Sequence, residues 1–415
     1  MNLKSKFQNG GIGRAFSSRN FRLFWYAHFS FIIATWVSRS SIAWLTWELT
    51  NSETWLGYMG AASMLPMLLL GPISGATADR YGHRRQLQIA TVIGGLVMLA
   101  LTIIFFANKI TPEILIFMTF LGGCTRSFTV PARNAMIHTL VDKKDLSAVI
   151  SVNGASYHSG NFIGPAVAGF ILYASNAGIA LAVYSIISFV VVVLYQFLDI
   201  EDGGTEKKNR KNISTELVEG FSYAYNNKDI RYLMIITAVV TFFLQPYMEL
   251  MPAFATDVYK RQVDGFAILS SAAGLGAMCG GLWLAQRGRN EGLMHILLLA
   301  TLVGVVAVIA FSQTQNFYIA MVELFFVGIS LVTSAIGSLS LLQNAVEPQV
   351  RGRVLALHGV LTLGGPALGA IIIGTFSEQY GVQTPVMISA LIGLVIWVLI
   401  VRPNMKYAAK LEKSD

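Results

Sequence analysis

Twelve long runs of apolar residues dominate this chain and decide what it can fold into. Each run is about twenty residues or longer, which is the length that an α-helix needs to cross the hydrocarbon core of a bilayer. The chain is 54% hydrophobic and only 13% charged, whereas a soluble globular protein carries about 25% charged residues. The runs also lack the polar–apolar alternation of a transmembrane β-barrel. The sequence therefore predicts an all-α polytopic membrane protein.

The predicted spans form two sets of six with one long polar stretch between them. The first set covers roughly residues 21–47, 55–78, 86–107, 112–139, 146–173 and 178–198. The second set covers roughly residues 232–255, 266–287, 293–312, 316–343, 350–376 and 382–402. We therefore expect an N-terminal six-helix half at 1–198, a cytoplasmic linker at 199–231 and a C-terminal six-helix half at 232–415. Within the linker, residues 214–227 have the pattern of an amphipathic helix that lies on the membrane.

The distribution of basic residues predicts the orientation of the chain in the membrane. Of the 30 Lys and Arg, only Lys109, Lys260 and Arg261 fall in loops on one side. The excess on the other side places both termini in the cytoplasm, because cytoplasmic loops of membrane proteins are rich in Lys and Arg. The net charge of +8 therefore reflects topology, and we expect no nucleic-acid partner. Cys124 and Cys279 both lie within apolar runs, so no disulfide is expected.

The short link between the second and third spans carries the most specific motif. It combines two glycines, one acid and three arginines at fixed positions: Gly75, Asp79, Arg80, Gly82, Arg84 and Arg85. Gly82 permits a turn that a side chain would obstruct, and the arginines are predicted to face Asp79. An ordinary basic loop would need neither the acid nor the glycines. The motif predicts a charge clasp at the cytoplasmic face that forms and breaks as the helices rock.

This motif resembles the loop between the second and third spans of the major facilitator superfamily. Three further segments narrow the resemblance to the branch that holds the enterobactin exporter and macrolide-efflux proteins: Phe21-Arg22-Leu23, Pro131-Ala132-Arg133 and Arg351-Gly352-Arg353. The resemblance covers nearly the whole chain. It implies two pseudo-symmetric halves, transport by alternating access, and a functional monomer in the bacterial inner membrane.

Internal matches between the two sets of spans fit a duplicated transporter. Gly164-Pro165-Ala166 in the fifth span resembles Gly365-Pro366-Ala367 in the eleventh. Residues 281–289 resemble a worn copy of the basic motif, with Ala285 in the place of the acid. A symmetric clasp on the second side is therefore not expected.

The fifth span carries glycines every four or five residues and a proline: Gly160, Gly164, Pro165 and Gly169. Such a strip lets a neighbouring helix approach closely, and the proline removes one backbone hydrogen bond. The pattern resembles the fifth-span motif of exporters and antiporters in the superfamily. The alternative interpretation is a general helix-packing strip.

Polar residues inside the spans are the candidates for binding substrate. Arg126 lies near the middle of the fourth span, where an isolated charge is costly and should face a wet cavity or an acid. The superfamily often has an arginine here that is tied to substrate or proton coupling, although a purely structural arginine is the alternative. Arg39 and His158 are candidates for the same cavity, and a histidine can change its charge near neutral pH or simply pack. Gln245 and Tyr247 can hydrogen-bond a substrate or a neighbouring helix.

Glu249 and Glu323 are the best candidates for carrying protons, because a carboxylate within the membrane can take up a proton instead of paying for a buried charge. Glu249 lies near the outer end of its span beside Pro252 and can equally sit in water. The chain has no Walker loop, no His/Cys cluster with metal-ligand spacing and no nucleophile elbow. We therefore expect no cofactor, no metal and no enzymatic activity, and transport driven by protons.

The intramembrane Arg39 and Arg126, against few buried acids, predict a positive cavity and an anionic cargo. Together with the branch resemblance, this favours proton-coupled export of a polycarboxylate or catecholate siderophore. Two alternatives stay open: multidrug or macrolide efflux with Arg126 structural, and a transport-dead sensor or scaffold that tolerates loss of Asp79. The expected partners are a small-molecule substrate, protons and the lipid bilayer.

Overall fold

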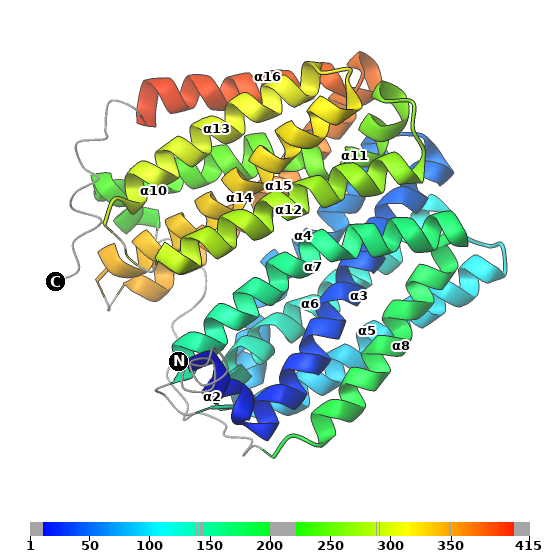
Figure 1. The fold of residues 1–415 in the computed structure, drawn as a ribbon, viewed down its shortest axis with the longest axis vertical. Helices are drawn as coiled ribbons and strands as arrows, with labels where there is room; N and C mark the ends of the chain where they lie inside the picture. The colour runs from blue at the N-terminus through cyan, green and yellow to red at the C-terminus, as the bar shows by residue number, and fades with distance from the viewer. Residues whose placement is uncertain are drawn as a thin grey trace, which may run out of the picture. The chain divides into compact units, whose positions relative to one another are not determined.

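The computed structural model shows a chain built from helices, with no β-strand among the residues that it describes (Figure 1). The described residues are 11–137, 139–141, 145–199, 221–287, 289, 291–347 and 350–401. By its internal contacts the chain divides into two compact units. Unit 1 comprises Met1–Ile42 and Leu69–Lys208, and unit 2 comprises Ala43–Leu68 and Asn209–Asp415.

Unit 1 contains the short helix α2 and six longer helices or parts of helices. They are α2 (Gly11–Ser17), most of α3 (Arg19–Thr50), the later part of α4 (Glu53–Tyr81), α5 (His83–Phe106), α6 (Pro112–Ile137), α7 (Leu146–Ala174) and α8 (Ala177–Gln196). Its core gathers large side chains of several helices, including Phe21, Phe24, Leu87, Met136 and Tyr195. This core fixes the positions of the polar side chains that lie among the same helices.

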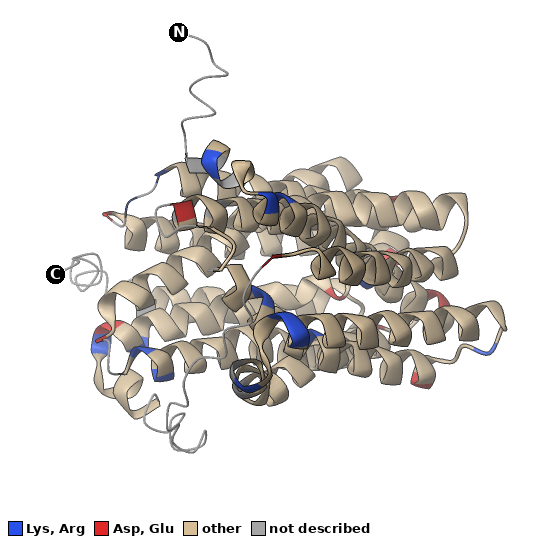
Figure 2. Ribbon diagram, turned by 90° about the horizontal axis from the view of Figure 1, so that it is seen from below, with Lys and Arg blue, Asp and Glu red and all other residues tan. Residues whose placement is uncertain are grey.

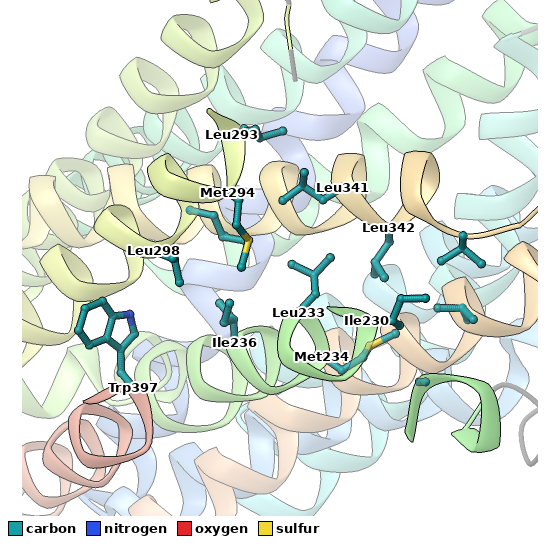
Figure 3. Packing of buried hydrophobic residues seen from close by; sticks show 14 of the residues in the cluster. Ile230, Leu233, Met234, Ile236, Leu293, Met294, Leu298, Leu341, Leu342 and Trp397 are labelled. Carbon is teal, nitrogen blue, oxygen red and sulfur yellow. The ribbon is translucent and has the colours of Figure 1, made fainter. Parts of the chain in front are cut away.

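Unit 2 contains the second set of helices together with the end of α3 and the first part of α4. These helices are α10 (Lys228–Ala238), α12 (Val263–Arg287), α13 (Leu293–Gln313), α14 (Phe317–Ala345), α15 (Arg351–Tyr380) and α16 (Gln383–Ile396), which η5 (Trp397–Val401) continues. Figure 3 shows one buried cluster of this unit, in which Leu233 and Met234 of α10 pack with Met294, Leu341 and Trp397.

Helices lie at every one of the predicted spans, and the predicted all-α polytopic fold is confirmed. Within the described part of the chain, nine helices are long and apolar enough to cross a membrane. The other predicted spans coincide with α3, α7 and the shorter apolar segment of α16 and η5. Figure 2 shows long stretches of helix without a charged residue, as expected of surfaces that face hydrocarbon.

The predicted span at 232–255 is not one regular helix, which corrects the sequence-based boundaries. After α10 the chain passes through four short elements: π-helical η2 (Val239–Leu244), 3-10-helical η3 (Gln245–Met248), α11 (Met251–Ala253) and π-helical η4 (Phe254–Val258). Pro246 and Pro252 stand at the starts of η3 and α11, and proline supplies no N–H to a helix. Irregular turns of this kind often mark functional positions.

The predicted division into two six-helix halves remains a prediction, and the two packed units cut the chain differently. Residues 43–68, which belong to the first set of spans, pack in unit 2. Most of the predicted linker, residues 200–220, lies outside the described residues. Of the predicted amphipathic helix, residues 221–226 are helical, and Asn227 caps α10 with its side-chain oxygen.

Candidate transport site

Helix α6 carries two arginines into unit 1 on one side of the helix. Arg126 and Arg133 are seven residues apart, which is about two turns, and both are half-buried. Arg126 and the hydroxyls of Tyr157 and Tyr195 all lie within electrostatic reach of Arg133. Its guanidinium donates to Asn134 Oδ1 at 3.3 Å, while its buried Nε has no hydrogen-bond partner among the described residues.

His28 of α3 and Asn153 of α7 adjoin the same arginine. His28 is only 2% exposed, stacks near Phe24 with ring centroids 5.4 Å apart, and interacts with both Asn153 and Arg133. His28 Nδ1 and Asn153 Oδ1 are buried without a hydrogen-bond partner in the described structure. Because buried polar atoms are nearly always paired, these atoms mark a place where a ligand or ordered water would complete the site.

A ladder of aromatic rings connects the predicted residues Arg39 and His158. The Arg39 guanidinium lies 5.5 Å from the Trp36 ring centroid. The Trp36 and Tyr157 rings are 5.9 Å apart, and the Tyr157 and His158 rings are 5.7 Å apart. His158 is half-buried, and its Nδ1 is buried without a hydrogen-bond partner among the described residues. The ladder links α3 to α7 and ends beside Arg133 through Tyr157.

The irregular segment of unit 2 holds three of the predicted site residues. Gln245 and Glu249 are half-buried, and Tyr247 is 1% exposed with a hydroxyl that has no partner among the described residues. Glu249 packs beside Gly60 of α4, since a Cβ built there would lie 2.7 Å from Glu249 Cγ. This contact lies within unit 2 and places Glu249 against a helix rather than in a fully exposed loop.

Glu323 of α14 forms a second polar group in unit 2. Its Oε1 accepts a hydrogen bond from Thr314 Oγ1 at 2.8 Å, and its Oε2 is buried without a partner in the described structure. The hydroxyl of Tyr259, also buried without a described partner, lies within electrostatic reach of Glu323. Burial raises the pKa of Tyr259, so its hydroxyl keeps its proton and remains a donor at physiological pH.

Two further carboxylates of unit 2 meet at the start of α4. Glu378 Oε2 accepts hydrogen bonds from Ser52 Oγ at 2.6 Å and from the backbone N–H of Thr54 at 3.3 Å. Glu53, which is 8% exposed, lies within electrostatic reach of Glu378 and Asp257. A carboxylate is stabilised at the N-terminus of a helix, and Glu378 thereby joins the end of α15 to the beginning of α4.

The predicted clasp lies at the turn between α4 and α5. Gly82 has φ 89° and ψ 138°, a backbone conformation that side chains disfavour. The Arg84 guanidinium donates to the carbonyls of Leu198 at 2.9 Å and Gln196 at 2.7 Å, so it caps the C-terminal end of α8. The side chain of Asp79 lies outside the described part of the structure, and the clasp remains a prediction.

The remaining residues of the motif, Arg80, Arg85 and Gly75, do not share one contact in the described structure. Arg80 stands over the Tyr81 ring at 5.3 Å from its centroid, Arg85 is exposed, and Gly75 is half-buried in α4.

The glycine strip of α7 packs against α3 in unit 1. A Cβ at Gly160 would collide with Ile32, and a Cβ at Gly164 would collide with Trp36. Helix α7 continues through Pro165 to Ala174, with Gly169 buried beyond it. The strip therefore positions Trp36, and through it the aromatic ladder.

Sequence reasoning missed His28, Asn153, Glu53 and Glu378 as members of these groups. The first three are polar residues within or at the end of an apolar run, which is the signal that marks a functional candidate in a membrane protein. Their partners come from distant segments and are not visible in the sequence. Among the described residues, no group of three or more His, Cys, Asp or Glu could hold a metal ion.

Long apolar helices with half-buried charged side chains among them define a polytopic membrane protein, in which such charges mark candidate functional sites. The family model for transmembrane secretion effectors, a family of the major facilitator superfamily, matches residues 14–414, and the chain belongs to that family.

Two curated relatives match nearly the full chain. The staphyloferrin A transporter of Staphylococcus aureus is 21% identical over 395 residues, covering 95% of this chain and 98% of that protein. Macrolide efflux protein A of Streptococcus pyogenes is 24% identical over 400 residues, covering 94% of this chain and 97% of that protein. The predicted resemblance to siderophore and macrolide exporters is confirmed at the level of the family.

Solved structures of transporters share the fold. The nucleoside transporter NupG superimposes with a TM-score of 0.67 at 16% identity, covering 95% of this chain and 99% of that one. The human organic anion transporter MFSD10 gives a TM-score of 0.66 at 14% identity, covering 91% of this chain and 99% of that one. The relatives and structural neighbours are transporters, and the chain is a transporter rather than an enzyme.

Proposed function

We propose that this protein exports an anionic small molecule across the bacterial inner membrane in exchange for protons, and that the cargo is a polycarboxylate or catecholate siderophore. The observation that carries this proposal is the separation of buried charges between the two units. Among the described residues away from helix ends, unit 1 half-buries arginines and unit 2 half-buries glutamates, whereas the buried acid of unit 1, Asp145, lies at the N-cap of α7 and pairs with Arg14. We further propose that the transporter acts as a monomer with both termini in the cytoplasm.

The bases of unit 1 favour an anionic cargo. Arg39, Arg126 and Arg133 are half-buried within its helices. The described acids of the same unit, Glu113, Asp145 and Asp199, lie at helix ends, and the buried Asp145 already accepts a hydrogen bond from Arg14 Nε at 2.9 Å. A positive charge within the membrane needs an anion or water, and a carboxylate or catecholate would supply a bidentate partner for a guanidinium. The likeness to the staphyloferrin A transporter supports a siderophore as that anion.

The acids of unit 2 favour coupling to protons. Glu249 and Glu323 are half-buried, and Glu53 is buried, whereas the described Lys and Arg of unit 2 lie at or near helix ends. In the proposed cycle, one of these carboxylates takes up a proton from the outer side when the anion leaves. It returns the proton to the cytoplasm before the next anion binds. Glu249 and Glu323 are the proposed carriers.

The gate and the glycine strip complete the proposed cycle. Asp79 with Arg80, Arg84 and Arg85 would close one face of the transporter in the outward-facing state, and Gly75 and Gly82 would permit the required close packing and turn. Gly160, Gly164 and Gly169 would let α7 move against α3 without side chains to interlock. Arg126, Arg39 and His158 are the proposed cargo-binding residues of unit 1, and Gln245 and Tyr247 are proposed cargo-binding residues of unit 2.

Macrolide or multidrug efflux is the second candidate function. It is favoured by the likeness to macrolide efflux protein A and by the aromatic ladder of Trp36 and Tyr157, which suits a large apolar cargo. In this case Arg126 would hold the helices together and would not contact the cargo.

Binding to the purified full chain separates the two functions. The panel contains iron-free citrate-type and catecholate siderophores, macrolides and lipophilic cations, measured by thermal shift and then by titration. The wild type is compared with Arg126→Ala, and Lys228→Ala serves as the control, because Lys228 is an exposed base at the start of α10. We expect an anionic siderophore to bind selectively and Arg126→Ala to weaken it.

Vesicle transport then tests export of the compound that binds. Uptake into inverted vesicles should require an inward-acidic proton gradient. Binding of macrolides or cations that is unaffected by Arg126→Ala would overturn the siderophore proposal and support drug efflux. Transport that survives loss of both Asp79 and Arg126 would remove the gate and the positive cavity from the mechanism.

A further inference from the structure

We propose that unit 1 binds one anionic phospholipid in a cavity between α4, α5 and α6, apart from the residues proposed to bind cargo. The cavity has a volume of about 530 Å³, and its lining begins beside the α4–α5 turn with Tyr81 and Arg85. The residues that matter for its chemistry are Tyr81, Arg85, Ile89, Ile93, Cys124 and Phe128. The site does not depend on which molecule the transporter exports.

The walls of the cavity match hydrocarbon. Arg85, Ile89 and Ile93 are four residues apart on α5 and line the cavity from one face of the helix. Ile89 is 51% exposed and Ile93 is 47% exposed. The exposed apolar surface of α5 continues beyond the cavity with Ile103, which is 60% exposed. An opening on such a surface admits an acyl chain, whereas a site for a water-soluble ligand needs several convergent polar groups.

The end of the cavity nearest the turn is basic. Arg85 lines it directly, and Arg80 and Arg84 lie on the same turn. Arg84 is engaged with the carbonyls at the end of α8, which leaves Arg85 as the base that belongs to the cavity wall. Tyr81 is 56% exposed beside it, a position typical of the membrane interface. Basic pockets between transmembrane helices on the cytoplasmic side bind anionic headgroups.

The basic and apolar residues of the cavity wall therefore follow each other in the same order as the headgroup and acyl chain of a phospholipid. A phosphate and its anionic headgroup would meet Arg85 at the interface, the glycerol region would lie beside Tyr81, and an acyl chain would run along Ile89 and Ile93. A zwitterionic lipid fits the same walls but gains less from the arginine cluster, because its headgroup carries no net charge. This charge complementarity commits the site to an anionic lipid.

The back of the cavity is a built surface that joins the three helices. Gln86 Nε2 donates to the carbonyl of Ser74 on α4 at 3.0 Å and to the carbonyl of Phe128 on α6 at 3.1 Å. The lipid would rest on this cross-linked wall directly beneath the turn that holds Gly82. Occupancy would then stabilise the conformation of the turn that bears the predicted clasp.

Native mass spectrometry of the full chain, released from nanodiscs with equal amounts of phosphatidylglycerol and phosphatidylcholine, tests the site. We expect one retained phosphatidylglycerol molecule. Loss of one base near the membrane surface should reduce its retention about 5-fold in Arg85→Gln. Lys228→Gln removes an exposed base elsewhere and should leave retention unchanged. Equal retention of both lipids, or equal retention in wild type and Arg85→Gln, would overturn the proposal.

Cys124 supplies a second readout inside the cavity. The chain has two cysteines, so Cys279→Ser leaves Cys124 as the single thiol. Its reaction with a membrane-permeant maleimide should be several-fold slower in phosphatidylglycerol nanodiscs than in phosphatidylcholine nanodiscs. Adding Ile93→Trp, which fills the cavity, should abolish this difference, whereas Ile103→Trp, on the same helix outside the cavity, should preserve it. Identical labelling rates in the two lipids would show that no anionic lipid covers the cysteine.

Discussion

Away from helix ends, the two packed units hold half-buried charges of opposite sign, arginines in unit 1 and glutamates in unit 2. In unit 1 Arg39 lies over the Trp36 ring, and polar atoms of His28, Arg133 and Asn153 remain without described hydrogen-bond partners. In unit 2 the carboxylates of Glu323 and Glu378 accept hydrogen bonds from the hydroxyls of neighbouring helices or turns.

This difference indicates what each unit lacks. Arg133 Nε is a buried donor that needs an acceptor, whereas Asn153 Oδ1 is an acceptor that needs a donor, and an unpaired buried group of either kind is unfavourable. In unit 2, Glu323 Oε1 and Glu378 Oε2 already accept hydrogen bonds, whereas Glu323 Oε2 is buried without a described partner, and uptake of a proton would relieve the cost of that buried charge. The difference supports the proposal that unit 1 binds an anionic cargo and that unit 2 carries protons.

The largest effect should come from neutralising Glu323. Glu323→Gln keeps the shape and the contact with Thr314 but removes the proton exchange, so accumulation of cargo against its gradient should be abolished. Facilitated exchange of cargo at equal concentrations should persist, because the bases of unit 1 are untouched. Both are measured in vesicles with and without a proton gradient, and Glu347→Gln, an exposed acid at the end of α14, serves as the control. Gradient-driven accumulation by Glu323→Gln would transfer the proton role to Glu249.

The next largest effect should come from Arg133 in unit 1. Arg133→Gln removes a buried charged donor, and hydrogen bonds to charged groups contribute about 1.5–3 kcal/mol, so binding of an anionic cargo should weaken by about 10- to 100-fold. Arg133→Lys should restore part of this loss, because it retains the charge but not the planar fork. Titration calorimetry provides the affinity. Unchanged affinity in Arg133→Gln, with normal thermal stability, would assign this arginine to packing alone.

The sequence was sufficient to predict the fold and some of the charged residues within the helices, but not the partners of those charges. Apolar runs of spanning length predicted every helix of the membrane part, since length and hydrophobicity are local properties. The break at Pro246 and Pro252 was missed, because the length of the apolar run at 232–255 predicts one span although two prolines within it disfavour a regular helix. Arg126 and Glu323 stood out as lone charges in apolar surroundings.

The partners of these charges could not be read from the sequence. Ser52 and Glu378 are 326 residues apart in the chain and meet only through the packing of α4 and α15. His28 and Asn153 likewise meet through the contact of α3 with α7, which the glycines of α7 permit. Such juxtapositions depend on which helix faces which neighbour, and periodicity along one helix does not reveal this.

A smaller effect should follow from separating Ser52 and Glu378. Ser52→Ala removes a short hydrogen bond to a carboxylate, and the partly exposed site limits the expected loss to about 1 kcal/mol of unfolding free energy. Glu378→Gln should have a similar effect, and the double variant should add little, because both remove one interaction. Thermal unfolding in detergent measures all three. Additive losses in the double variant would mean that each side chain has another stabilising partner.

The smallest effect should distinguish two buried hydroxyls of unit 2. Tyr247 and Tyr259 both pack near Phe311, and neither hydroxyl has a described partner. Replacing either by Phe should leave thermal stability unchanged or slightly raised, because an unpaired buried hydroxyl is unfavourable. Tyr247→Phe should still weaken cargo binding by about 2- to 10-fold, the effect of one hydrogen bond, while Tyr259→Phe should not.

The matched pair decides how far unit 2 contributes to recognition. Both variants lose one hydroxyl from the same aromatic cluster, so any nonspecific effect on packing should appear in both. Weaker binding in Tyr247→Phe alone would place a cargo contact in the irregular segment around Pro246. That contact would be a neutral hydroxyl, in contrast to the charged guanidinium groups of unit 1. Equal binding in both variants would confine cargo recognition to unit 1. Unit 2 would then act through its carboxylates only, which is the strictest form of the division between the two units.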